Sequence, residues 1–230
     1  MYLREVRWLV PFPSDVKAVL FDFDHTLIDL GADWEGLRKD IAAMSAKYGV
    51  PFEERWVLRG IGMTFRKLSD EGREADAAKF KNEAFKRVVD EENSALPNSK
   101  PIDGAVDVVN ELMVRGYKIA IDSNNNPDSI SRALQMFEFP KIEHVVGRNN
   151  GDPVKPSPIP VLKALSRLHV GPKQTVFVGD SEADLAAGKA AGVATVLFSN
   201  NGASKEIKTK PAEKIDSLLK LLEMLPGRAK

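Results

Sequence analysis

Residues 18–26 read AVLFDFDHT, an apolar run that ends in acidic and polar residues. Its first half is an apolar run with the length and composition of a buried strand. Asp22 and Asp24 come at its end, at the alternate spacing that aims both side chains the same way in an extended chain. Strands disfavour aspartate, and burying unpaired carboxylates costs several kcal/mol, so these two acids indicate a chemical function.

After residue 98 the sequence alternates between segments with helical periodicity and short apolar runs. The segments expected to be helical are 105–114, 129–137, 159–168, 185–191 and 212–225, and the expected strands are 118–121, 144–146, 175–178 and 194–197. Strands that alternate with helices of about ten residues predict an α/β fold, with helices on both faces of a doubly wound parallel sheet.

Residues 29–97 have a different character, because they are charged, helix-favouring and almost free of strand signals. They stand between the first strand and its next helix, so we expect an inserted helical domain in a core made of residues 1–28 and 98–230. About four helices are expected, with breaks at 49–51, at 60–62 and near 72. The stripe expected to form the centre of this domain is Val57, Leu58, Ile61, Phe65 and Leu68. Residues 6–10 are expected either to form an edge strand or to pack on the core.

The bulk composition excludes several kinds of function. Lys+Arg and Asp+Glu both number 33, and the absence of a basic stripe argues against nucleic-acid binding. There is no cysteine, which excludes disulfides and thiolate metal sites, and the three histidines lack zinc-ligand spacing. No apolar run approaches the roughly 20 residues that span a membrane, and the N-terminus does not resemble a signal peptide. We therefore expect a cytoplasmic protein.

The carboxyl ends of the expected strands deliver polar side chains to one edge of the sheet. The second strand ends in Asp122-Ser123-Asn124 and the fourth in Gly179-Asp180-Ser181, with Asp184 soon after. Lys155-Pro156 lies between the third and fourth strands. Because ligands of doubly wound sheets bind at this edge, the acids, the hydroxyl and the lysine are expected to form one site.

These side chains fit a magnesium and phosphate site. Mg²⁺ prefers oxygen ligands and typically uses one or two carboxylates, which Asp22, Asp24 and Asp180 supply. Ser123 and the amides of the turns are suited to hold phosphate oxygens, and Lys155 is suited to neutralise their charge. Each motif alone has an ordinary interpretation: Asp180 to Asp184 as a helix cap, Ser123 as part of a turn, Lys155 as a solvated lysine.

Taken together, the four motifs resemble those of the haloacid dehalogenase (HAD) superfamily. Asp22-x-Asp24-x-Thr26, the strand ending in Ser123, Lys155-Pro156 and Gly179-Asp180-Ser181-x-x-Asp184 occur in that superfamily's order between about residues 17 and 200. The insertion is similar to its small helical C1-type cap, as in phosphoglycolate phosphatase-like members. Many relatives have glycine where this chain has His25.

The resemblance implies a role for each matching residue. Asp22 is the implied nucleophile, and Asp24 the acid and base. The implied ligands of Mg²⁺ are Asp22, the backbone carbonyl of Asp24, and Asp180. The remaining implied roles are phosphate binding by Ser123, Asn124 and Lys155, shaping of the loop by Thr26, and support of the metal or of Lys155 by Asp184.

The activity implied is Mg²⁺-dependent hydrolysis of a small phosphorylated metabolite through an aspartyl-phosphate on Asp22. Phosphoglycolate and sugar phosphates are the implied substrates. Asp24 disfavours dehalogenation, which needs no acid at that position. A sugar phosphomutase uses the same pair of aspartates and stays an alternative. A non-enzymatic binding or regulatory protein on this scaffold is a second alternative, although it would be expected to have lost one of the motif residues.

Overall fold

The computed structural model describes residues 10–149, 152–199 and 207–227. The chain divides into two compact units. Unit 1 comprises the residues up to Asp29 and those from Lys100 onward, and unit 2 comprises Leu30–Ser99. Of the segment 6–10 only Val10 is described, so the edge strand expected there lies outside the described residues. None of the described helices combines the length and the apolar character that crossing a membrane requires.

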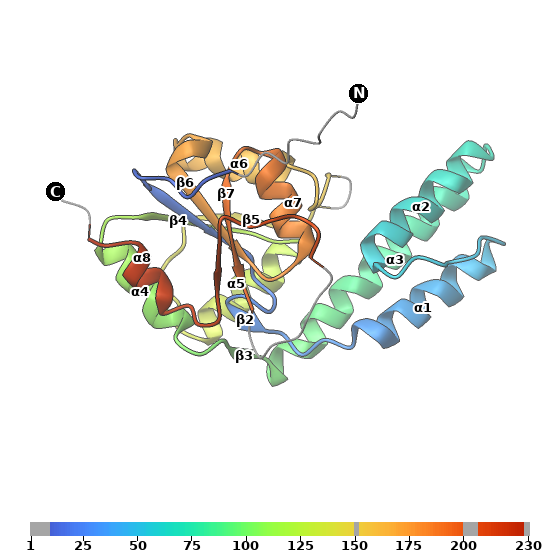
Figure 1. The fold of residues 1–230 in the computed structure, drawn as a ribbon. Helices are drawn as coiled ribbons and strands as arrows, with labels where there is room; N and C mark the ends of the chain where they lie inside the picture. Colours follow the sequence, from blue (N-terminus) through green and yellow to red (C-terminus); the bar gives the residue numbers. More distant parts are fainter. Residues whose placement is uncertain (1–9, 150–151, 200–206, 228–230) are drawn as a thin grey trace, which may run out of the picture. The chain divides into compact units, whose positions relative to one another are not determined.

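A parallel sheet forms the centre of unit 1. In the described residues its strands are β1 (Ala18–Phe21), β4 (Lys118–Asp122), β5 (His144–Val146), β6 (Thr175–Gly179), β7 (Ala194–Phe198) and β8 (Glu213–Ile215). Their order is β5-β4-β1-β6-β7-β8, and every neighbouring pair is parallel (Figure 1). The strand β1 is entirely buried between β4 and β6, which explains its uniformly apolar sequence.

Helices cover both faces of this sheet. They are α4 (Ala105–Val114), α5 (Pro127–Met136), α6 (Ile159–Leu168), α7 (Glu182–Ala190) and α8 (Lys220–Met224). On one face, Leu20 and Phe177 pack with Val161 of α6 and Ala187 of α7. Helices α4, α5 and α8 lie on the opposite side (Figure 1). The predicted doubly wound parallel sheet is therefore confirmed.

A two-stranded antiparallel sheet lies where the chain leaves and re-enters unit 1. It consists of β2 (Ile28–Asp29) and β3 (Lys100–Pro101). Asp29 pairs with Lys100, and the backbone N–H of Ile102 donates to the carbonyl of Leu27 over 2.9 Å. The two segments that connect unit 1 to unit 2 are thus hydrogen-bonded to each other next to the loop that follows β1.

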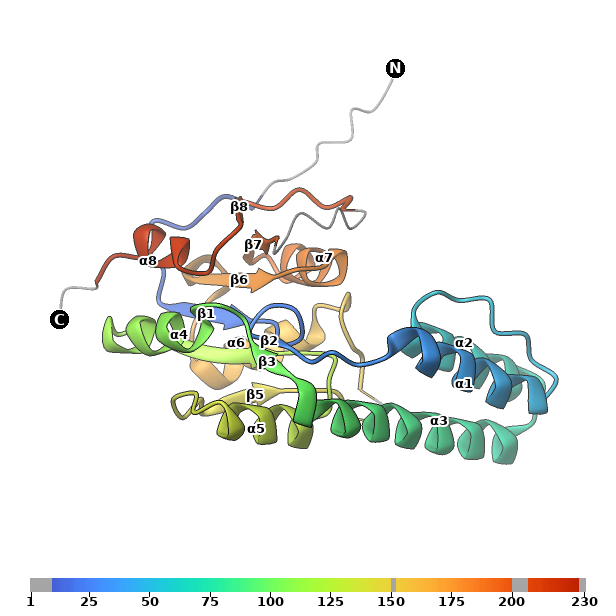
Figure 2. The same ribbon diagram turned by 90° about the horizontal axis from the view of Figure 1, so that it is seen from below.

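In its described residues unit 2 consists of three α-helices, α1 (Trp34–Lys47), α2 (Val57–Asp70) and α3 (Glu74–Ala95), followed by the 3₁₀ turn η1 (Leu96–Asn98) (Figure 2). Its apolar core contains Ile61 and Leu68 of the predicted stripe, and Val57, Leu58 and Phe65 pack against it. The interpretation of this stripe as core is confirmed. The role of the unit as a cap stays a prediction.

The expectation of four helices in the insertion is wrong, because the break predicted at residues 60–62 lies inside α2. A Cβ atom on Gly60 would lie 2.1 Å from Cζ of Phe52. The glycine is therefore needed for the close packing of an aromatic ring against the helix, and it does not end the helix.

The single helix predicted over 212–225 is also wrong, because the segment contains the strand β8 and then the short helix α8. The N–H of Ala212 donates to the carbonyl of Thr195, and the N–H of Ser199 donates to that of Ile215, both over 2.9 Å. These bonds to β7 and to the residue after it override the local helical preference and make β8 the edge strand of the sheet.

Candidate active site

Asp22 directly follows β1 at the carboxyl edge of the sheet. Its backbone N–H donates to the carbonyl of Val178 on β6 over 2.9 Å, which continues the sheet up to the predicted nucleophile. Asp22 is 7% exposed to solvent. Burial raises the pKa of the Asp22 carboxyl well above its usual value, the charge of Asp184 raises it further, and Lys155 opposes both.

Lys155 reaches this edge from the loop between β5 and α6, and its ammonium is buried among three acceptors. Nζ lies 2.7 Å from Oδ1 of Asp22 and 2.6 Å from Oδ1 of Asp184, and it donates to the carbonyl oxygen of Asp122 over 2.7 Å. Burial lowers the pKa of Lys155, but the charges of Asp184, Asp22 and Asp122 outweigh burial and raise it. The ammonium therefore stays charged, and the interpretation as a solvated lysine is wrong.

The loop of Lys155 is fastened to the end of β4 by Asn124. The backbone N–H of Lys155 donates to Oδ1 of Asn124 over 2.9 Å, and Nδ2 of Asn124 donates to the carbonyl of Lys155 over 3.2 Å. Arg148 in turn donates from Nη1 to the carbonyl of Asn124 over 2.7 Å. The predicted phosphate ligand Asn124 thus uses its amide to hold the backbone that carries the lysine.

Ser123, the other predicted phosphate ligand from this strand end, is 4% exposed. Its N–H donates to the carbonyl of Val146, and its hydroxyl donates to Oδ1 of Asn125 over 2.9 Å. The hydroxyl also accepts a hydrogen bond from the N–H of Asn125 over 3.2 Å. The turn interpretation therefore describes the local structure, and the phosphate role of Ser123 stays a prediction.

The start of α7 brings Asp184 to Lys155. Ser181 and Asp184 form a capping box, in which the N–H and hydroxyl of Ser181 donate to Oδ2 of Asp184. Oδ1 is left to meet Lys155. A Cβ atom on Gly179 would lie 2.5 Å from Cβ of Asp184, so only glycine permits this approach. The helix-cap interpretation of Asp184 is therefore confirmed, while its role in supporting the metal or Lys155 stays a prediction.

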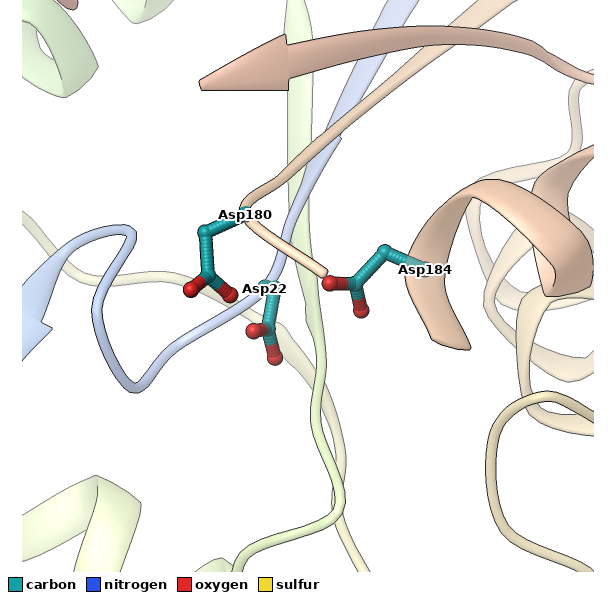
Figure 3. Close-up of side chains that lie close together, drawn as sticks. All are labelled: Asp22, Asp180 and Asp184. Atoms are coloured by element: carbon teal, nitrogen blue, oxygen red, sulfur yellow. The ribbon is translucent and has the colours of Figure 1, made fainter. Parts of the chain in front are cut away.

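Asp22, Asp180 and Asp184 can each offer a carboxylate oxygen within 4.8 Å of those of the other two (Figure 3). Three convergent carboxylates suit a hard divalent cation such as Mg²⁺. Both oxygens of Asp184 already contact Lys155 and Ser181, which agrees better with its predicted supporting role than with that of a direct ligand. The donor set therefore fits the predicted metal.

The loop after β1 positions Asp24, whose side chain is 12% exposed. His25 adopts a left-handed backbone with φ of 61°, a conformation that glycine adopts more readily. Its Nε2 lies 3.8 Å from Oδ2 of Asp24, and its Nδ1 lies 3.8 Å from Oδ1 of Asp29. Thr26 is fully buried, and its Oγ1 has no hydrogen-bond partner within the described residues.

Sequence reasoning assigned no role to Asp122, which ends β4 beside the site. It is fully buried, and burial raises the pKa of its carboxyl to about 6, with the charge of Lys155 opposing that rise. The sequence already placed it at this edge, and the signal that could have assigned it a role is the one that singled out Asp22, an aspartate at the end of an apolar strand.

The comparisons with known proteins agree with this geometry. A family model for haloacid dehalogenase-like hydrolases matches residues 19–198. A phosphoglycolate phosphatase of Aquifex aeolicus is 30% identical over 186 residues, which cover 79% of this chain and 84% of that protein. A pyrophosphatase of Bacillus mycoides is 27% identical over 215 residues, which cover 91% of this chain and 97% of that protein.

Among solved structures, that of a HAD phosphatase from Thermococcus onnurineus has a TM-score of 0.63 and 22% identity, covering 92% of this chain and 99% of the other. This likeness concerns the fold. The family model matches well over half of the chain, and the relative from Aquifex aeolicus is similar over most of both lengths. The chain therefore belongs to the haloacid dehalogenase-like hydrolase family, as its four motifs predicted.

Proposed function

We propose that this chain is a phosphatase that hydrolyses phosphomonoesters in a Mg²⁺-dependent reaction. The observation that carries the proposal is the buried Asp22 carboxylate, held 2.7 Å from the Lys155 ammonium with Asp180 and Asp184 around it. A carboxylate oriented in this way is suited to act as a nucleophile, and the neighbouring acids could supply oxygen ligands for a cation. Membership of a hydrolase family with relatives named as phosphatases supports the same activity.

In the proposed reaction an oxygen of Asp22 attacks phosphorus. The bond from phosphorus to the ester oxygen breaks, and an aspartyl-phosphate forms. Asp24 gives a proton to the leaving alcohol and then accepts one from the water that attacks the aspartyl-phosphate. Asp22 returns as a free carboxylate, inorganic phosphate leaves, and the proton on Asp24 replaces the one that it donated.

Positioning and charge supply the remaining catalysis. Lys155 neutralises charge on Asp22 and on the transferring group, and Ser123 is the proposed hydroxyl ligand of the phosphate. The bonds of Asn124 to the Lys155 backbone support a holding role for its amide. Mg²⁺, bound by Asp22, Asp180 and the backbone carbonyl of Asp24, would supply positive charge to the phosphoryl group.

The proposed substrate is a small phosphorylated metabolite in the cytoplasm. The names of the two relatives make phosphoglycolate the first ester to try and pyrophosphate, a phosphoanhydride, a further compound, followed by sugar phosphates. The helical unit 2, if it serves as a cap as predicted, would exclude polymers and bulk water from the reaction.

The test is release of inorganic phosphate from these compounds and from a generic aryl phosphate, with Mg²⁺ and with a chelator. We expect the wild type to require Mg²⁺, and Asp22→Asn to lose activity by at least about a thousandfold, because the amide is no nucleophile. Asp40→Asn is a matched control, since it removes a carboxylate that pairs with Arg87 in unit 2. It should keep wild-type activity.

A folded wild type that releases no phosphate from any ester would contradict the proposal. Transfer of phosphate between positions of a sugar phosphate, without its release, would indicate a phosphomutase. Binding of a phosphorylated ligand without turnover would indicate a regulatory protein.

A further inference from the structure

Asp122 is a buried acid that the proposed reaction does not use. It ends β4 and is 0% exposed. Both of its carboxyl oxygens lack a hydrogen-bond partner within the described residues. Buried carboxylates are usually paired, because an unpaired charge loses its solvation without compensation. An acid in this position therefore requires a reason other than stability.

The surroundings of Asp122 are those of the active site. Phe21 pairs with Ile121 in the sheet, so Asp22 and Asp122 directly follow paired residues on adjacent strands. The backbone carbonyl of Asp122 accepts a hydrogen bond from Lys155, and its carboxyl interacts electrostatically with Lys155 and Asp184. Asp122 thus adds a charge to the cluster that contains the nucleophile.

The charges in this cluster do not balance. Within the described residues, the carboxyl groups of Asp22, Asp122 and Asp184 share the ammonium of Lys155, so three acids face one cation. With the pKa of Asp122 at about 6, its carboxyl is ionised at pH 8. A buried excess of negative charge destabilises a protein unless a cation binds there.

Asp122 is also distinct from the group of possible ligands. Within the described residues, the group of three acids whose carboxylate oxygens lie within 4.8 Å of one another consists of Asp22, Asp180 and Asp184. We propose that the Asp122 carboxylate strengthens Mg²⁺ binding at this site without being a ligand, and that it destabilises the metal-free protein. The inference rests on the proposed function, because it assumes that these acids hold Mg²⁺.

The experiment measures Mg²⁺ dissociation constants by calorimetry, and melting temperatures with chelator and with Mg²⁺, all at pH 8. We expect Asp122→Asn to bind Mg²⁺ about five- to tenfold more weakly than the wild type, because one buried charge is removed at an unchanged ligand set. With chelator, its melting temperature should exceed that of the wild type. The rise in melting temperature on adding Mg²⁺ should be smaller than in the wild type.

Two further variants make the result specific. Asp107→Asn, at an exposed position in the first turn of α4, removes the same charge from the surface and should leave unchanged both Mg²⁺ affinity and the rise in melting temperature on adding Mg²⁺. Asp122→Ala removes the carboxyl without introducing an amide and should weaken Mg²⁺ binding like Asp122→Asn. It replaces the amide variant if that one does not fold.

Equal Mg²⁺ affinity of the wild type and the Asp122 variants would overturn the inference and leave the proposed function intact. A wild type that binds Mg²⁺ but hydrolyses no ester would overturn the proposed function alone. A wild type that binds no Mg²⁺ would overturn both.

Discussion

Lys155 and Asp184 in unit 1 place their charged atoms 2.6 Å apart, and Lys86 and Asp90 in unit 2 do the same. The side chains of the first pair are each 2% exposed, whereas those of the second are 75% and 52% exposed. The exposed pair joins successive turns of one helix, while the buried pair joins a loop to the start of α7.

Burial, and not pairing, therefore distinguishes the site. An exposed ion pair contributes about 0–1 kcal/mol, because water solvates the separated charges nearly as well. In a buried pair each charge depends on the other, and removing one partner costs about 3–5 kcal/mol. Such an arrangement is poor evidence of selection for stability and is typical of catalytic sites.

Replacing the two lysines tests this comparison most directly. We expect Lys155→Met to lower the free energy of unfolding by about 3 kcal/mol or more at pH 8, because Asp22 and Asp184 lose their shared cation. Lys86→Met should change it by less than about 0.5 kcal/mol. Urea denaturation in the presence of a chelator measures both. The Lys155 variant should also lose at least about a hundredfold in phosphate release.

Equal stability losses in the two variants would break the comparison, since they would mean that burial adds nothing to the pair. Loss of activity in Lys86→Met with its fold intact would assign the exposed pair a function that its position does not suggest.

The stability of the metal-free protein should depend on pH through the acids beside Lys155. The carboxyl of Asp122 has a usual pKa of 3.8, which burial raises to about 6 in the folded state. Between these values the folded state binds more protons than the unfolded state, so stability is lost as the pH rises. The titration of Asp122 lowers the free energy of unfolding by on the order of 1–3 kcal/mol, and this loss is complete above about pH 7.

Urea denaturation with chelator at pH 4.5 and pH 8 measures this dependence. Asp122→Asn should gain stability relative to the wild type on going from the lower to the higher pH. The difference between the two proteins cancels the other titrating groups. An unchanged difference would mean that Asp122 titrates alike in the folded and unfolded states.

The grouping of the site residues at one edge of the sheet was predictable, because the connectivity of the chain imposes it. Parallel strands place their carboxyl ends together, so the sequence alone could predict Asp22, Asp180 and Lys155 at one edge. The burial of Lys155 was not predictable, since it depends on Asn124 holding its backbone from another strand end. The requirement for glycine at position 179 likewise depends on a distant residue, because Asp184 occupies the space where a side chain would begin.

The errors share a cause, which is that tertiary contacts decide where local signals are weak. The segment 212–225 has helical composition, but hydrogen bonds to β7 make its first part a strand. Gly60 signals a break, but Phe52 occupies the space where its side chain would be. Neither contact leaves a pattern within the segment that it controls.

The two glycines of α2 extend the comparison from charge to packing and give the smallest expected effects. A Cβ on Gly60 would overlap the Phe52 ring, whereas one on Gly62 would meet nothing within 4 Å. Gly60→Ala should therefore lower the free energy of unfolding by about 1–2 kcal/mol, since the ring must move. Gly62→Ala should raise it by about 0.5–1 kcal/mol through helix propensity. Thermal denaturation followed by circular dichroism measures both, and phosphate release should stay unchanged in Gly62→Ala. Stabilisation by both substitutions would mean that the Phe52 ring imposes no packing constraint on position 60, and that helix propensity alone decides the effect there.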